Sequence, residues 1–176
     1  SILLALVLGE FAIRVTDIDI PRRSDIRALH GIMRPGYTEF YRFEPNTRTV
    51  AVSPSAEFAV EYRINRVGMR DIDHTTYKKP GTTRIVFLGD SLTEGYGVEL
   101  HQSYPYLIQS LSGGKFDCIN AAMRGMSPAD YAFRIQNVLD IYKDIDVLVL
   151  SLNGKEFYDD EKYEKHYGLK VNPAGH

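Results

Sequence analysis

With 176 residues, of which 44% are hydrophobic, the chain is long enough to bury the core of one domain and to carry a small appendage. Its formal net charge of −2 gives no global basic field, so the sequence offers no electrostatic support for nucleic-acid binding. The single cysteine, Cys118, excludes an internal disulfide framework and a cysteine-based zinc site, and its apolar neighbours predict a buried structural thiol.

The chain begins with a uniformly apolar run from Ile2 to Leu8. This run is shorter than the roughly 20 apolar residues of a membrane-spanning helix, and the chain starts at Ser1 rather than at a methionine. We therefore expect residues 1–15 to be the end of a transmembrane helix that anchors the protein in a membrane. A hydrophobic helix packed on the domain is the alternative.

Residues 16–36 predict a polar connector that contains Pro21 and Pro35. By the positive-inside rule, the arginines in and beside this connector favour a cytoplasmic flank: Arg14, Arg22, Arg23, Arg27 and Arg34. Contacts with solvent, lipid headgroups or a partner would explain the same arginines. The side of the membrane therefore stays open at this point.

Residues 37–83 predict a small β-rich appendage followed by a loop. Apolar and polar residues alternate from Phe58 to Ile64, with Phe58, Val60, Tyr62 and Ile64 on one face. The segment Thr49–Val52 is the expected partner strand, and the turn at residues 53–55 joins the two.

An unbroken apolar run, Ile85–Leu88, predicts a strand that is buried on both faces and ends at Gly89. Because glycine permits a sharp turn, Ser91 is expected at the carboxyl end of the strand with its hydroxyl exposed. Backbone N–H groups at the start of the next turn would face the same space and could stabilise an oxyanion. Thr93 replaces the last glycine of a G-x-S-x-G elbow, and Leu100 replaces the third glycine of a dinucleotide fingerprint, which excludes both motifs.

The residues Gly89-Asp90-Ser91-Leu92, with Thr93-Glu94-Gly95-Tyr96-Gly97-Val98 after them, resemble the first block of the SGNH, or GDSL, hydrolase family. In that family the serine of this block is the nucleophile. Residues 65–71 are similar to the Asn-x-x-Gly-Phe-Arg pattern that precedes the core in many membrane-anchored bacterial members. Such proteins usually face outward, so the resemblance implies an extracytoplasmic (periplasmic) location. The arginines of the connector favour the cytoplasmic side instead. An ordinary turn with a structural serine is the alternative.

Beyond Ser91 the pattern alternates between helices and strands. Ser103 and Ser127 predict the starts of two helices. Phe116–Ile119 predicts a further short strand, and Val147–Leu150 predicts a second buried strand. The first helix is expected to bury Leu107, Ile108 and Leu111, and the second to bury Tyr131, Ile135, Val138, Leu139 and Tyr142. This order predicts an α/β fold over residues 84–176, a three-layer α/β/α sandwich with a parallel sheet, flavodoxin-like in kind.

The loops after parallel strands meet at one edge of the sheet, and two of them resemble further blocks of the family. Residues 120–127 resemble the second block, which implies that Gly125 supplies a backbone N–H to the oxyanion hole; a glycine needed only for loop geometry is the alternative. The third block, Gly-x-Asn-Asp or Gly-x-Asn-Glu, is represented by Ser151-Leu152-Asn153-Gly154. The resemblance implies that the amide of Asn153 also donates to the oxyanion, whereas a turn asparagine is the alternative. It assigns no role to Arg124.

The family's last block, an Asp-x-x-His that holds the general base, is missing near the end of the chain. No aspartate lies three residues before His166 or His176. The segment Asp71-Ile72-Asp73-His74 precedes the serine, and we interpret it as a coincidence in a surface loop. Because a serine hydroxyl is a poor nucleophile without a base, we expect the domain to be truncated or degenerate and the chain to be inactive.

Two functions follow. The resemblance implies an esterase or O-acetyl transferase of the cell envelope that acts on acylated carbohydrate through Ser91, Gly125 and Asn153, with its base on sequence outside this chain. The alternative is a non-catalytic structural or interaction subunit docked on a membrane protein complex. No cofactor or metal is expected, because the acidic run 159–161 predicts a solvated helix start rather than a metal cluster.

Overall fold

A computed structural model of the chain describes residues 33–35, 41–53, 55–126 and 128–154. The predicted membrane-helix end (1–15), most of the connector and the tail 155–176 lie outside these residues. Within the described ranges, none of the helices combines the length and the apolar character that crossing a bilayer requires.

A parallel sheet of three strands forms the centre of the fold. Strand β5 (Thr83–Leu88) lies in the middle, with β6 (Phe116–Asn120) on one side and β7 (Val147–Leu150) on the other. All three coincide with predicted strands, because each is a short apolar run between turn signals. The middle strand is the one that leads into Gly89, so the serine turn leaves from the centre of this sheet.

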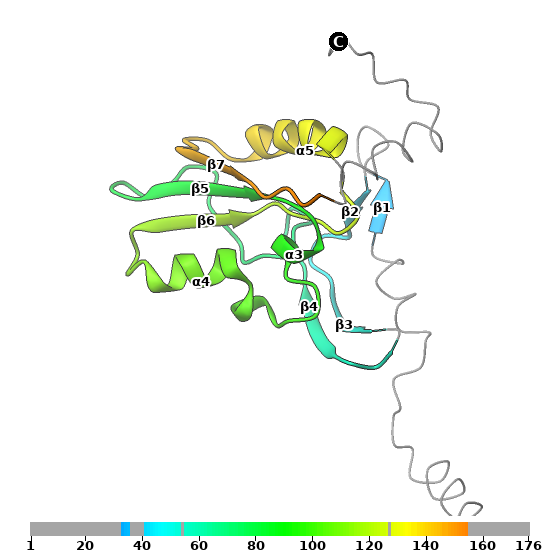
Figure 1. Cartoon of the computed structure of the whole chain (residues 1–176). Helices are drawn as coiled ribbons and strands as arrows, with labels where there is room; N and C mark the ends of the chain where they lie inside the picture. Colours follow the sequence, from blue (N-terminus) through cyan, green and yellow to red (C-terminus); the bar gives the residue numbers. More distant parts are fainter. Residues whose placement is uncertain (1–32, 36–40, 54, 127, 155–176) are drawn as a thin grey trace, which may run out of the picture.

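Helices α4 (Tyr104–Leu111) and α5 (Pro128–Ile141) lie on opposite faces of the sheet (Figure 1). The ring of Phe87 on β5 contacts the ring of Tyr104 on α4, with centroids 5.5 Å apart. The guanidinium of Arg84, which points to the other face of the same strand, lies 5.6 Å from the ring of Tyr142 just after α5. These contacts confirm the three-layer α/β/α arrangement of this part of the chain.

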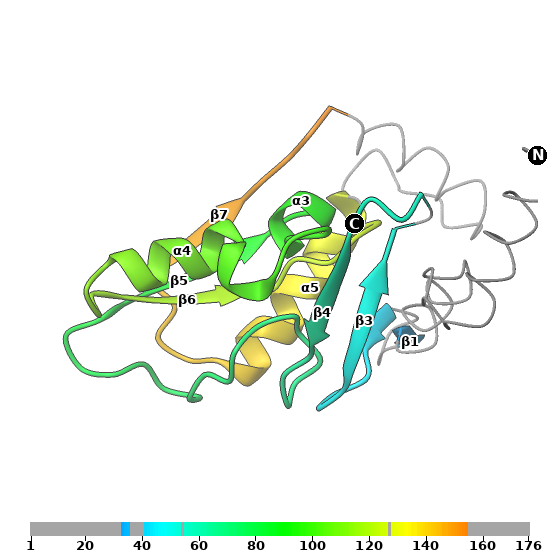
Figure 2. The same ribbon diagram turned by 90° about the horizontal axis from the view of Figure 1, so that it is seen from below.

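Two antiparallel hairpins precede the sheet: β1 (Met33–Pro35) with β2 (Tyr41–Phe43), and β3 (Arg48–Val52) with β4 (Ala59–Arg63). The second is the predicted appendage, and its alternation is confirmed, since Val60, Tyr62 and Ile64 are buried. It lies beyond the carboxyl ends of the sheet strands (Figure 2). Its inward side chains belong to the same hydrophobic cluster as Val86 and Leu88 of β5.

Arg70 joins this hairpin to the segment that follows the serine. Its side chain is fully buried and lies 3.8 Å from the centre of the Tyr62 ring. One terminal nitrogen donates to the carbonyls of Gly95 (2.5 Å) and Glu94 (3.2 Å), and the other to those of Val98 (2.6 Å) and Glu61 (3.2 Å). Four carbonyls from two separate parts of the chain therefore share one cation.

The outer edge of β6 is closed by side chains. Its alternate N–H groups at Phe116, Cys118 and Asn120 donate to Ser112 Oγ (3.1 Å), Gln109 Oε1 (2.7 Å) and Asp71 Oδ2 (2.7 Å). Cys118 is buried as predicted, and burial raises the pKa of its thiol to about 11. The thiol is therefore an inert part of the core.

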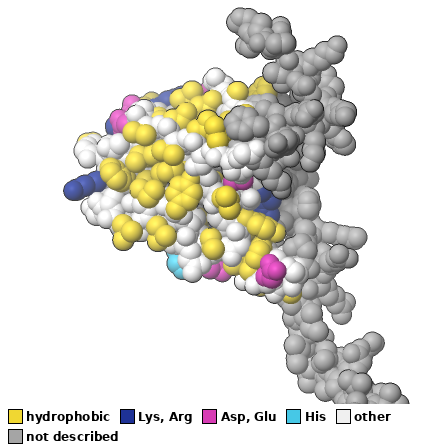
Figure 3. All heavy atoms as spheres, in the orientation of Figure 1, with side chains coloured by type: hydrophobic (Ala, Val, Ile, Leu, Met, Phe, Trp, Pro, Cys, Tyr) yellow, Lys and Arg dark blue, Asp and Glu magenta, His cyan; other side chains and the backbone are white. Residues whose placement is uncertain are grey.

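Three predictions of burial are wrong. In α4 the expected stripe is exposed (Leu107 40%, Ile108 36%, Leu111 83%). The residues of α4 that face the sheet are instead Tyr104 and Pro105, and Gln109 bonds to β6, so the expected stripe is rotated outward. Strand β7 exposes Val147, Leu148 and Leu150, since within the described residues it pairs only with β5. Leu139 of α5 is also exposed, on the side of the helix away from the sheet. Hydrophobic side chains accordingly gather on the face shown in Figure 3.

Candidate active site at the carboxyl ends of the parallel strands

The turn after β5 needs glycine at its first position. A Cβ atom on Gly89 would lie 2.2 Å from Thr93 Oγ1, 2.7 Å from Thr93 Cβ and 3.3 Å from Ser151 Cβ. Asp90 follows as the N-cap of a one-turn helix, α3 (Ser91–Glu94), and its Oδ1 accepts the N–H of Leu92 at 2.9 Å. Ser91 is thus the first helical residue at the end of the central strand. Its hydroxyl is partly exposed and has no hydrogen-bond partner in the described part of the chain.

We expect Gly89→Ala to lower the free energy of unfolding by about 2 to 3 kcal/mol, because Thr93 is buried and its branched side chain cannot move aside without displacing the turn. Denaturant unfolding followed by circular dichroism measures this. Gly154→Ala is the matched control, since a Cβ there meets no atom of the described residues within 4 Å, and its effect should stay within about 0.5 kcal/mol. Equal effects in the two variants would show that the turn tolerates a side chain.

The loop after β6 carries Gly125 back to the serine turn. The N–H of Met123 donates to the carbonyl of Gly89 at 3.1 Å, which ties the two loops together. Gly125 itself is exposed and has a φ of 74°, a conformation that favours glycine. A Cβ at this position would meet no atom of the described residues within 4 Å, so among these residues the backbone conformation, and not crowding, accounts for glycine here.

The loop after β7 places Asn153 beside the residue that precedes the serine. The N–H of Ser151 donates to the carbonyl of Leu88 at 2.9 Å, and Nδ2 of Asn153 donates to Oδ2 of Asp90 at 2.5 Å. Ser151, which departs from the family pattern, shares a hydrogen bond of 2.8 Å with the hydroxyl of Tyr104. The three loops that carry Ser91, Gly125 and Asn153 are therefore linked by hydrogen bonds, and the catalytic roles of these residues stay predictions.

The interpretation of Asp71 and His74 as part of a surface loop is wrong, since both are buried. Nε2 of His74 lies 3.1 Å from Asp71 Oδ2, and Nδ1 lies 2.7 Å from Asp117 Oδ1. The segment lies along β6, because Asp71 also accepts the N–H of Asn120. Both ring nitrogens of His74 already face carboxylates, so neither is available to take a proton from Ser91.

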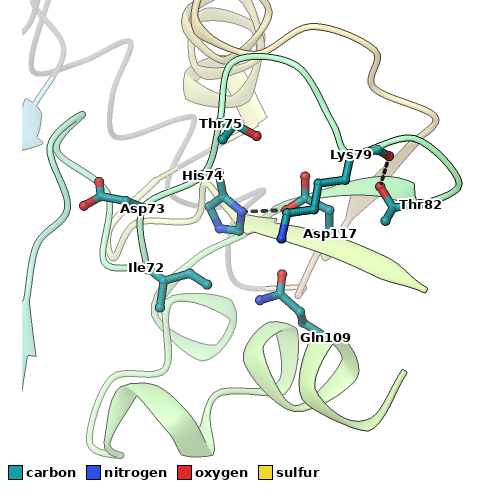
Figure 4. Close-up of a pocket in the computed structure, with 8 residues that line it drawn as sticks. All are labelled: Ile72, Asp73, His74, Thr75, Lys79, Thr82, Gln109 and Asp117. Carbon is teal, nitrogen blue, oxygen red and sulfur yellow. Dashed lines mark hydrogen bonds and ion pairs between the residues drawn. The ribbon is translucent and has the colours of Figure 1, made fainter. Parts of the chain in front are cut away.

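A pocket of about 270 Å³ opens next to this histidine (Figure 4). It is lined by Ile72, Asp73, His74, Thr75, Lys79, Thr82, Gln109 and Asp117. The buried His74 and the partly buried Asp117 in its lining are already paired, since Asp117 bonds to His74 and also accepts from Nε of Arg84 at 2.8 Å. None of the predicted catalytic residues lines it, so the pocket is separate from the candidate site.

A buried carboxylate at the candidate site was not predicted from the sequence. Glu94, the last residue of α3, is fully buried and accepts the hydroxyl of Tyr62 at 2.6 Å and the backbone N–H of Arg124 at 2.5 Å. It also pairs with the guanidinium of Arg124. The available signal was a glutamate one helical turn after the buried strand, because an acidic side chain close to a buried strand needs a partner.

Comparison with solved structures found limited similarity to SGNH-hydrolase family esterases. One is described as AlinE4, a SGNH-hydrolase family esterase; it has a TM-score of 0.40 and 29% identity over 47% of this chain and 46% of that one. A mutant of esterase AlinE4 gives a TM-score of 0.39 and 23% identity over 52% of this chain and 58% of that one. The chain thus spans about half the length of the structures it matches. No protein-family model and no curated protein matched the chain.

Proposed function

We propose that this chain carries the serine-bearing part of an acyl-ester hydrolase or acyl-transfer site, with Ser91 as the nucleophile. The observation that supports it most is the set of hydrogen bonds from the loops of Gly125 and Asn153 to Gly89 and Asp90, the two residues before Ser91. A serine at the end of a central parallel strand, with two such loops beside it, lies where ligands bind in α/β sheets. The partly exposed Ser91 hydroxyl, without a partner in the described ranges, is consistent with a nucleophile.

In the proposed reaction, Oγ of Ser91 bonds to the acyl carbon of an ester, and the hydroxyl proton passes to a base. The carbonyl oxygen becomes an oxyanion that accepts from the backbone N–H groups of Ser91 and Gly125 and from the Asn153 amide. The alcohol then leaves with a proton, and water or a second alcohol receives the acyl group from the serine. The substrate class that we propose from the motif is acylated carbohydrate of the cell envelope, with the protein anchored in a membrane and facing away from the cytoplasm.

The proton transfer is the step that the described residues do not support. His74 is enclosed by carboxylates, and the other described histidine, His101, lies exposed on the short helix η1 (Leu100–Gln102). A serine without a base forms its acyl adduct slowly, because the hydroxyl holds its proton. We therefore propose that the chain of 176 residues turns over simple esters poorly.

Imidazole added to the solution tests this proposal, because it supplies a base that can enter the site. We expect imidazole at neutral pH to accelerate the acetylation of Ser91 by a naphthyl acetate ester by at least about tenfold. Intact mass and peptide mapping would locate the adduct. The Ser91→Ala variant measured in the same imidazole series gives the background, and Ser110→Ala, which removes an exposed serine of α4, is the control that should retain the effect.

Equal acetylation in the presence and absence of Ser91 would contradict the proposal. Fast Ser91-dependent turnover without imidazole would support the nucleophile and overturn the proposed lack of a base. The alternative function, a non-catalytic subunit docked on a membrane protein complex, is favoured by one observation, the exposed Val147, Leu148 and Leu150 on β7. Absence of any reaction at Ser91, even with imidazole, would make that alternative the better explanation.

A further inference from the structure

The carboxylate of Glu94 connects the helix of Ser91 to the loop of Gly125. Glu94 ends α3, the one-turn helix that Ser91 begins. One of its oxygens accepts the backbone N–H of Arg124, the residue directly before Gly125, and the other accepts the hydroxyl of Tyr62 on β4. The side chain of Glu94 is 0% exposed, so these bonds form away from competing water.

The side chain of Arg124 is held by the same carboxylate and by aromatic rings. Its guanidinium donates to Glu94, and its central carbon lies 4.6 Å from the centre of the Tyr96 ring, 4.7 Å from that of Tyr62 and 5.7 Å from that of Phe43. Burial is the largest single effect and lowers the pKa of Arg124, but the charge and hydrogen bonds of Glu94, together with Tyr62 and Tyr96, outweigh it and raise that pKa. Arg124 is thus a permanent cation enclosed on several sides.

Among the described residues, Gly125 has no comparable restraint of its own. It is exposed, a Cβ there would meet no described atom within 4 Å, and the nearest bonds of its loop in the described ranges are those of Met123 to Gly89 and of Met126 to Met123 (3.4 Å). The Gly125 N–H belongs to the peptide between Arg124 and Gly125, so its direction depends on the backbone of Arg124. Glu94 holds Arg124 at two places, the backbone N–H on the other side of its Cα and the guanidinium of its side chain.

We propose that Glu94 and Arg124 are positioning residues that hold the Gly125 N–H in the direction required to donate to an oxyanion on the acyl group of Ser91. This inference rests on the proposed function. Tyr62 connects the β3–β4 hairpin to the same group of hydrogen bonds, because its hydroxyl donates to the other oxygen of Glu94. A displacement of an oxyanion donor by about 1 Å is enough to slow catalysis by about 100-fold, so a small loosening of this loop has a large effect.

The test uses Glu94→Gln in the full chain, because glutamine keeps the shape of the side chain but has one acceptor oxygen for the four groups that donate to the carboxylate. We expect the Arg124 amide proton, followed by NMR, to exchange with solvent at least about tenfold faster than in the unchanged protein. The Gly125 amide resonance should shift. In the presence of imidazole, acetylation of Ser91 should slow by about 10- to 100-fold.

Asp117→Asn is the matched control, since it also removes the charge of a carboxylate bound to an arginine, Arg84, away from the candidate site. It should lower stability but leave the Arg124 exchange rate and the acetylation rate within about twofold. In the double variant Glu94→Gln/Arg124→Gln, acetylation should be no slower than in the slower single variant, because both changes release the same loop.

Unchanged exchange at Arg124 in Glu94→Gln would overturn the inference, whether or not Ser91 reacts. Faster exchange with an unchanged acetylation rate would also overturn it, since the loop would then be loosened without consequence for the oxyanion. If Ser91 of the unchanged protein fails to react with imidazole present, the proposed function fails, and the inferred catalytic role fails with it. The exchange measurement then reports only whether Glu94 holds the loop.

Discussion

Replacing Arg84 by methionine should lower the free energy of unfolding by about 3 to 5 kcal/mol, the largest loss that we expect from a single substitution in this protein. Arg84 is fully buried in β5, where Nε donates to Asp117 and the terminal nitrogens donate to the carbonyls of Thr75, Thr76 and Lys143 at 2.7 to 2.8 Å. Methionine fills much of the space but donates nothing. The partly buried carboxylate of Asp117 loses one of its two charge partners, and three carbonyls lose their donors.

Urea unfolding followed by circular dichroism would measure this loss, with Arg48→Met as the matched control. Arg48 also lies on a β-strand and pairs with a carboxylate, Glu61, at 3.1 Å, but its side chain is 68% exposed. Its replacement should cost less than about 1 kcal/mol, because exposed ion pairs are screened by water. Similar losses in the two variants would mean that burial of Arg84 does not increase its contribution to the free energy of unfolding.

Stability should fall as the pH rises from about 6.5 to above 9, because His74 gives up its proton in that interval. Burial by itself lowers the pKa of His74, but the hydrogen bonds with Asp117 and Asp71 outweigh burial and raise the pKa to about 9. The folded protein therefore holds the proton more tightly than the unfolded chain, whose histidine pKa is about 6.5. The stabilisation is complete below pH 6.5 and is lost through pH 9, with a total of about 3 kcal/mol.

The measurement is the free energy of unfolding at a series of pH values, together with the NMR titration of the His74 ring. His74→Gln should remove most of the pH dependence in this interval. His101→Gln, which changes an exposed histidine on η1, should retain it. A flat profile for the unchanged protein, or a titration of the ring near pH 6.5, would contradict the raised pKa of His74.

The elements that the sequence predicted correctly are those whose signals are local. The strands β5, β6 and β7 are apolar runs, and the β3–β4 hairpin alternates with a period of two, so each element follows from neighbouring residues alone. The side on which a helix packs depends on contacts distant in sequence. The rotation of α4 is set by the bond of Gln109 to Cys118, a contact that periodicity does not contain.

The burial of charged residues could not be predicted from the sequence. Arg70, Arg84 and Glu94 are fully buried although their residue types are almost always exposed, and each forms hydrogen bonds with groups from distant segments. For the candidate site, sheet topology correctly predicted that the loops after β5, β6 and β7 would meet. The bond of Asn153 to Asp90 and the enclosure of Arg124 required the three-dimensional arrangement, because no spacing in the sequence encodes them.

The closed edge of β6 limits where a strand from another molecule could add to the sheet. A strand from another molecule can extend a sheet only by forming main-chain hydrogen bonds with an edge, and the N–H groups of Phe116, Cys118 and Asn120 are already occupied. Intermolecular β-pairing at β6 would first have to break these three bonds. Aggregation by strand addition is therefore disfavoured at this side of the sheet, even where Phe116 is partly exposed.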